Sequence, residues 1–107
     1  MTAKPVIPRE QARRDVEAAI DFYAIEAGEA VALRFVDAVE AAFAAIARLP
    51  ASGSPRYGHE LDLPGLRSRL VKGYPYLVFY VERGAHVDIW RVLHAQRDIP
   101  AWLGESD

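Results

Sequence analysis

The first half of the chain has the spacing of two amphipathic helices. Apolar residues recur every three or four positions over residues 9–27, which predicts a helix with one buried stripe. The pattern resumes after Gly28, continues over residues 29–49 and ends at Pro50. Because a single glycine separates the two helices, we expect them to form an antiparallel hairpin.

The second half changes to the patterns of β-strands. Residues 66–72 alternate between apolar and polar side chains, and residues 74–81 are rich in β-branched and aromatic side chains. A turn predicted at residues 82–85 leads into a third strand at residues 86–93. Short connections between these strands predict an antiparallel meander.

Short elements at both ends complete the predicted fold. Val6 and Ile7 predict an edge strand, and residues 95–103 predict a C-terminal helix that starts either at Ala95 or at Ile99. The order is then β-α-α-β-β-β-α, an α+β fold in which a helical hairpin packs on one face of a small antiparallel sheet. The 107 residues are expected to form a single domain, residues 1–107.

Composition excludes several classes of function. The chain has no cysteine, so disulfides, thiolate metal sites and a cysteine nucleophile are absent, and a cytoplasmic location is expected. We find no signal-peptide pattern and no apolar stretch of membrane-spanning length, so no membrane association is expected. A net charge of −2 is unlike that of an autonomous, sequence-specific nucleic-acid binder. Residues 9–29 are acidic and residues 66–97 are basic, which suits binding to partners.

The sequence contains no strong catalytic or metal-binding motif. The three histidines, His59, His86 and His94, are spaced too widely for a familiar zinc site. His86 and Asp88 share a strand face, but two ligands on one edge make a weak site. We therefore expect neither a metal nor a cofactor.

The most informative residues are cations and aromatic side chains on the predicted meander. If the helices cover one face of the sheet, we expect polar residues on an open, concave second face. These groups could clamp a phosphodiester and transfer a proton during RNA cleavage, or they could form a partner-binding interface. The set comprises Arg67, Arg69, Tyr76, Tyr80, Trp90, Arg91, His94 and Arg97.

Each member also has a simpler structural interpretation. Trp90 and Tyr76 are expected to pack in the core or at its rim. Arg67 and Arg91 would pair with Asp88 or Glu82 on neighbouring strands, and the strand-end histidine of the set would bond a backbone group. For any single one of these residues, a structural role is the better interpretation.

Taken in order, several short segments resemble the ParE/RelE superfamily of bacterial type II toxin–antitoxin toxins, and its ParE branch in particular. The ending Arg-Val-x-His-x-x-Arg-Asp after a β-meander is the most specific of them. The segments are Arg13–Tyr23, Ala32–Phe35, Leu49-Pro50 with Gly53, Arg56, Leu66-Arg67, Tyr76–Tyr80, and Arg91–His94 with Arg97-Asp98.

The resemblance implies a hairpin on an antiparallel sheet and an antitoxin partner, ParD-like, that wraps the toxin in a hetero-oligomer. The ParE toxins described poison DNA gyrase by binding it and are not enzymes. The resemblance supplies no gyrase-contact motif that maps onto this chain. Beside the hairpin and at an exposed strand edge, an extended antitoxin segment is expected to add backbone hydrogen bonds. Candidate partner-binding residues are Arg67, Arg69, Tyr76, Tyr80, Trp90 and Arg97.

Two alternatives stay open at this point. The first is a ribosome-dependent mRNA endoribonuclease, in which Arg67 and Arg91 would stabilise charge on the phosphate and His94 would act as acid or base. Against it, residues 51–65 contain Arg56 as their one Lys or Arg, and no tyrosine follows Tyr80. The second alternative is a non-toxic protein whose role is to bind an antitoxin.

Overall fold

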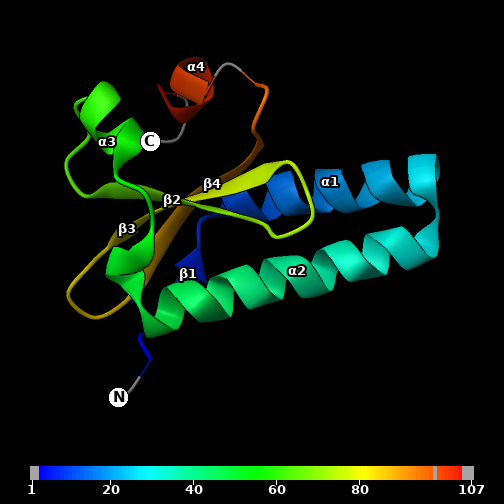
Figure 1. The fold of residues 1–107 in the computed structure, drawn as a ribbon, viewed down its shortest axis with the longest axis horizontal. Coiled ribbons are helices and arrows are strands. Elements are labelled where there is room, and N and C mark those ends of the chain that lie inside the picture. The colour runs from blue at the N-terminus through cyan, green and yellow to red at the C-terminus, as the bar shows by residue number, and fades with distance from the viewer. Residues whose placement is uncertain (1–2, 98, 105–107) are drawn as a thin grey trace.

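The computed structural model describes residues 3–97 and 99–104 (Figure 1). Strands and helices follow one another in the predicted order, with two additional short helices between the hairpin and the meander. In chain order the elements are β1 (Val6–Pro8), α1 (Glu10–Ala27), α2 (Glu29–Arg48), the 3₁₀ helix η1 (Pro50–Ser52), α3 (Arg56–Glu60), β2 (Leu66–Leu70), β3 (Tyr76–Glu82), β4 (Val87–His94) and α4 (Ile99–Gly104).

The four strands form one sheet in the order β1-β4-β3-β2. The pairs β2–β3 and β3–β4 are antiparallel, as the meander requires. The edge strand β1 adds a parallel pair, in which Val6 lies opposite Val87. The predicted α+β fold with a hairpin on a small sheet is confirmed, and the sheet is mixed because β1 runs parallel to β4.

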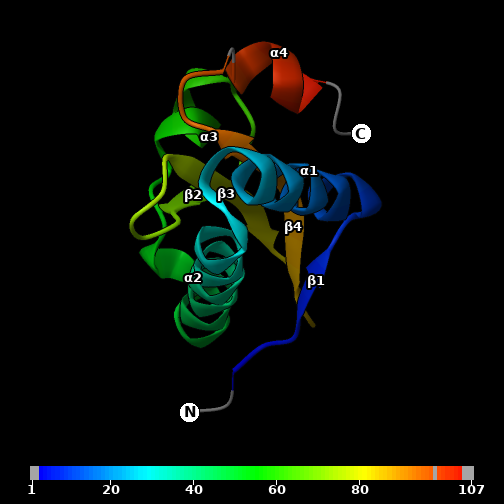
Figure 2. The same ribbon diagram turned by 90° about the vertical axis from the view of Figure 1, so that its right-hand side faces the viewer.

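The helical hairpin covers one face of the sheet. Gly28, with φ of 96°, reverses the chain between α1 and α2, which then lie side by side (Figures 1 and 2). A positive φ is costly for residues with a Cβ, so glycine suits this turn. Buried side chains from both helices, among them Ala19 of α1 and Phe35 of α2, pack against Val78, Tyr80 and other residues of the sheet.

The opposite face of the sheet is also covered. A second apolar cluster joins Leu66, Phe79 and Leu93 of the strands to Ile99 and Leu103 of α4, with side chains around α3 packed at its edge. The expectation of an open, concave second face was therefore wrong. The reason is that α4 and the segment around α3 bury apolar side chains that the sheet presents on this side.

Of the two short helices α3 and α4, the sequence predicted only α4. The C-terminal helix begins at Ile99, the later of the two predicted starts, and residues 95–97 form a turn. Helix α3 was not predicted, because its five residues contain Gly58 and are too few to show a helical period.

The loop after α2 is fastened to the centre of the sheet by Tyr80. The buried Tyr80 hydroxyl donates a hydrogen bond to the Pro50 carbonyl (2.6 Å) and accepts one from the Gly53 N–H (3.0 Å). The Arg67 guanidinium donates to the Gly53 carbonyl (2.8 Å). A Cβ at Gly53 would collide with the Tyr80 hydroxyl and lie 3.0 Å from the Ser68 carbonyl oxygen.

We predict that Gly53→Ala lowers the free energy of unfolding by about 1–3 kcal/mol, since a methyl group here overpacks a closed site. Gly84→Ala is the matched control, because nothing lies within 4 Å of its added Cβ and its φ is not positive. Urea unfolding followed by far-UV circular dichroism measures both. Equal stability of the two variants would contradict the close packing described.

Candidate functional site

The candidate site lies where β4 continues beyond its last residue paired with β1. Strand β1 pairs with β4 only from Val87 to Ile89, and beyond that point the edge of β4 faces α1. Asp15 of α1 takes over the role of a pairing strand, because its Oδ2 accepts a hydrogen bond from the Val92 N–H (3.0 Å). A side chain thus satisfies a backbone donor that would otherwise lack a partner in the sheet.

The same carboxylate holds Arg91. Arg91 Nε lies 2.7 Å from Asp15 Oδ2 and Arg91 Nη2 lies 2.8 Å from Oδ1, a two-pronged ion pair. The third prong, Nη1, donates to the Trp102 carbonyl of α4 (3.0 Å). Arg91 is 0% exposed. Its charge is therefore neutralised inside the protein, and it ties α1, β4 and α4 together.

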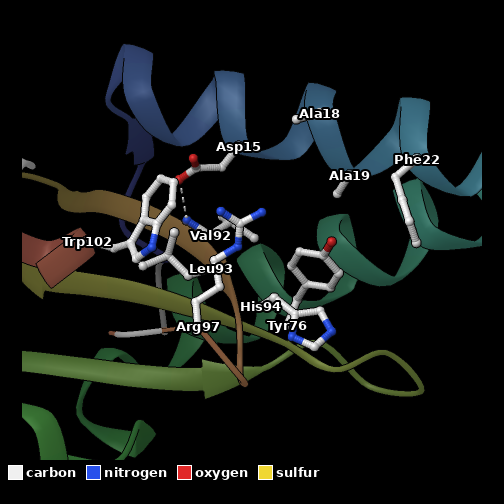
Figure 3. A pocket seen from close by; sticks show the side chains of 10 residues that line it. All are labelled: Asp15, Ala18, Ala19, Phe22, Tyr76, Val92, Leu93, His94, Arg97 and Trp102. Carbon is white, nitrogen blue, oxygen red and sulfur yellow. Dashed lines mark hydrogen bonds between the residues drawn. The ribbon is translucent and has the colours of Figure 1, made fainter. Parts of the chain in front are cut away.

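A pocket of about 290 Å³ opens beside this ion pair, between α1, the end of β4 and α4 (Figure 3). We call it the α1–α4 pocket. Figure 3 shows that side chains of α1 form one wall and that Tyr76, His94 and Arg97 face them. The lining residues are Asp15, Ala18, Ala19, Phe22, Tyr76, Val92, Leu93, His94, Arg97 and Trp102.

The polar groups at the rim of the α1–α4 pocket are held by local contacts. The Tyr76 and His94 rings meet edge to face, with centroids 5.3 Å apart, and His94 Nδ1 accepts the Gln96 N–H (3.1 Å). Burial raises the pKa of the Tyr76 hydroxyl, and the nearby Arg97 charge partly opposes this, so the phenol stays neutral. The Arg97 guanidinium lies over the Trp102 ring, 4.5 Å from its centroid.

The structure distributes the eight predicted residues over both faces of the sheet. Arg67 lies opposite Tyr80 and Arg69 opposite Val78, so both arginines point toward the side that the hairpin covers. Tyr76 also packs there, whereas Trp90 packs with the α4 side. The eight residues therefore do not form one surface.

Tyr80 and Arg91 are fully buried, which corrects their prediction as surface groups. Tyr80 is at the centre of the sheet, where a large side chain fills the space beneath the hairpin. The expected pairing of Arg67 and Arg91 with Asp88 or Glu82 was also wrong, because Arg67 donates to a backbone carbonyl and Arg91 to Asp15. The expected backbone bond of the strand-end histidine is confirmed.

Asp15 is a residue that the sequence analysis missed. It follows Ala12 by three positions, so it falls on the apolar stripe of α1 that packs against the sheet. A carboxylate on a buried stripe requires a partner. The position of Asp15 in the sequence therefore indicates a buried ion pair or hydrogen bond. It does not identify the partner, Arg91, which is 76 residues away.

A second carboxylate, Asp88, organises the other end of β4. It accepts hydrogen bonds from Arg9 (2.9 and 3.1 Å), Arg83 (3.2 Å) and the Trp90 Nε1–H (3.1 Å). The Arg9 guanidinium lies over the Trp90 ring, 4.8 Å from its centroid. Burial raises the pKa of the Asp88 carboxyl, but the three donors outweigh it, and the net pKa lies below its ordinary value.

Within residues 3–97 and 99–104, no group of three or more His, Asp or Glu side chains is arranged to hold a metal ion. Over the same residues, no helix is both long and apolar enough to span a bilayer.

Comparison with known proteins identifies the family. Residues 6–99 match the family model described as the ParE toxin of the type II toxin–antitoxin system, parDE. The chain belongs to the ParE toxin family. The resemblance drawn from the sequence is thereby confirmed for nearly the whole chain.

A solved structure supports the same fold. A chain of the "Chromosomal ParDE TA system from P. aeruginosa" superimposes on this ParE-family chain with a TM-score of 0.75. The match covers 88% of this chain and 98% of the other, at 19% sequence identity. No curated protein matches the sequence.

We predict that Asp15→Asn lowers the free energy of unfolding of this ParE toxin by about 3–5 kcal/mol, because it leaves the Arg91 charge buried without a counter-charge. Glu10→Gln is the control, since it removes an exposed pair with Arg14 (3.4 Å) on the same helix and should change stability little. Urea unfolding measures both variants. The Asp15→Asn, Arg91→Met double variant should recover part of the loss, and equal stability of the single variants would contradict the role of Asp15.

The lowered pKa of Asp88 gives this ParE toxin an acid-sensitive contribution to stability. The unfolded chain binds the proton more readily, so the contribution is complete above the ordinary pKa of 3.8 and is lost as pH falls through the lower, folded value. We predict that the loss of stability from about pH 6 to about pH 3 is smaller in Asp88→Asn than in the wild type. Urea unfolding at each pH measures the difference, and parallel curves would contradict it.

Proposed function

We propose that the chain is a toxin that inhibits DNA gyrase by binding it, and that a cognate antitoxin neutralises the toxin. The match of residues 6–99 to the ParE toxin family carries this proposal. A similar fold alone would not, because one fold serves many functions. A gyrase inhibitor acts where the chromosome is, so we place the chain in the cytoplasm, in a hetero-oligomer with its antitoxin while it is silent.

The positions of the candidate catalytic groups favour binding over RNA cleavage. Arg67 points toward the hairpin side, together with Tyr80. Arg91 lies opposite Phe79, which packs on the α4 side. A guanidinium that stabilises the charge on a phosphate during RNA cleavage must direct its N–H donors at that phosphate. Arg91 is instead enclosed by Asp15 and Trp102, and we propose a non-enzymatic inhibitor.

The partner-binding surface is proposed from those predicted residues that keep part of their side chains accessible. Arg67, Arg69, Tyr76 and Trp90 are partly exposed, and Arg97 is exposed. Arginine, tyrosine and tryptophan frequently dominate the energetics of interfaces. Because these side chains lie on both faces of the sheet, we propose that they serve two partners rather than one.

The test is a supercoiling assay on the purified chain freed from antitoxin. We expect loss of supercoiling of relaxed plasmid by gyrase in the presence of ATP, or accumulation of cleaved DNA, and restoration of supercoiling when the cognate antitoxin is added. The denatured chain serves as the control.

Full supercoiling with folded chain in excess would contradict the gyrase proposal. The same preparation would then be mixed with ribosomes and mRNA. Cleavage that disappears in His94→Ala would establish the endoribonuclease alternative, and antitoxin binding without either activity would establish the non-toxic one.

A further inference from the structure

We infer that the α1–α4 pocket and the exposed apolar stripe of α1 form the docking surface for one linear segment of the antitoxin. The segment would place a large apolar side chain in the pocket and a carboxylate at Arg97. This inference rests on the proposed function, since it takes the antitoxin as the partner.

The size and lining of the pocket suit a side chain rather than a small-molecule ligand. Its volume of about 290 Å³ is at the lower limit of small-molecule sites, which hold roughly 300–1,000 Å³. Its walls are largely apolar, with Ala18, Ala19 and Phe22 of α1 facing Val92 and other side chains across the hollow (Figure 3). The Asp15 charge at the inner end is paired with Arg91. An apolar group can therefore reach the inner end of the pocket without removing water from an unpaired charge there.

Outside the pocket, the apolar surface continues along α1. Ala18, Phe22 and Ile25 follow one another at i, i+4 and i+7, so they lie on one face of the helix. Phe22 is 54% exposed and Ile25 is 80% exposed. Isolated exposed apolar residues are ordinary, but a row that leads out of an apolar pocket indicates an interaction surface. The row is one helix wide, which matches a single peptide segment laid along it.

Charges at the two ends of this surface set the direction of the segment. Arg97 is exposed, and among the described residues no carboxylate lies within 4.0 Å of it. Glu26 is exposed near the Gly28 end of the stripe, and Asp21 is exposed beside Phe22 at its middle. Complementary charges fix the register of a bound segment. The antitoxin segment therefore carries its acidic group beside the pocket anchor and basic groups toward the hairpin turn.

The inference is tested by filling the pocket. Ala18 is exposed on its wall, so Ala18→Phe occupies the hollow without disturbing the core. The matched control is Ala41→Phe, an exposed alanine of α2 that does not line the pocket. By calorimetry against the purified cognate antitoxin, we expect Ala18→Phe to weaken binding by about 10-fold or more and Ala41→Phe by less than about 2-fold.

The charge is tested separately. Arg97→Glu should slow association with the antitoxin and flatten its dependence on salt, because a rim charge acts mainly on the association rate. Arg97→Lys should restore much of both, and Arg34→Glu, at an exposed arginine of α2, is the control. Near-UV circular dichroism verifies that every variant is folded.

The outcomes separate this inference from the proposed function. Wild-type affinity for the antitoxin in the folded Ala18→Phe variant would overturn the inference. So would an Ala18→Phe variant that binds the antitoxin normally but no longer inhibits gyrase, because that result would assign the pocket to the target. Absence of antitoxin binding by the wild type would overturn the neutralisation proposal and this inference together. Antitoxin binding that Ala18→Phe weakens supports the inference whether or not gyrase is the target.

Discussion

The contact between Asp15 and the end of β4 is the constraint on which the arrangement of the site depends. A strand at the edge of a sheet leaves backbone donors and acceptors that need partners. β1 covers only three residues of β4, and the Asp15 carboxylate satisfies the next part of that edge through the Val92 N–H while neutralising Arg91. This draws α1 over the edge and, through the Trp102 carbonyl, holds α4 in place. The hollow between the two helices follows from that placement.

The two charged clusters on β4 have different purposes in the same strand. At its beginning, Asp88 gathers Arg9 and Arg83 at a partly accessible position, and the cluster fastens the entry to α1. Farther along, the Asp15 pair is closed to solvent on the arginine side. Replacing such a pair by apolar residues is often tolerated, whereas removing one member is not. The buried pair is thus better understood as a device that fixes the register between α1 and β4 than as a large source of stability.

Much of the fold could be predicted because its signals are local. The hairpin and the meander are periodic over many residues, so the two helices and three strands were predicted with boundaries close to those observed. The site could not be predicted in the same way. The partner of Arg91 is 76 residues distant, and the burial of Tyr80 depends on the loop at Gly53 and on the hairpin above it. Helix α3 lacks a period, and the sequence predicted the C-terminal helix but not its packing on the sheet, so the second face was wrongly expected to be open.

The parallel pairing of β1 with β4 has a consequence for the order in which the chain can fold. Val6 pairs with Val87, and Arg9 and Asp15 find their partners on the same late strand. Contacts of such large sequence separation form after local ones, because the loop they close costs entropy first. During synthesis the helical hairpin can form early, but β1 stays unpaired until β4 has left the ribosome. The surface that α1 and β4 build together therefore forms only after β4 has been synthesised, although the hairpin itself can fold earlier.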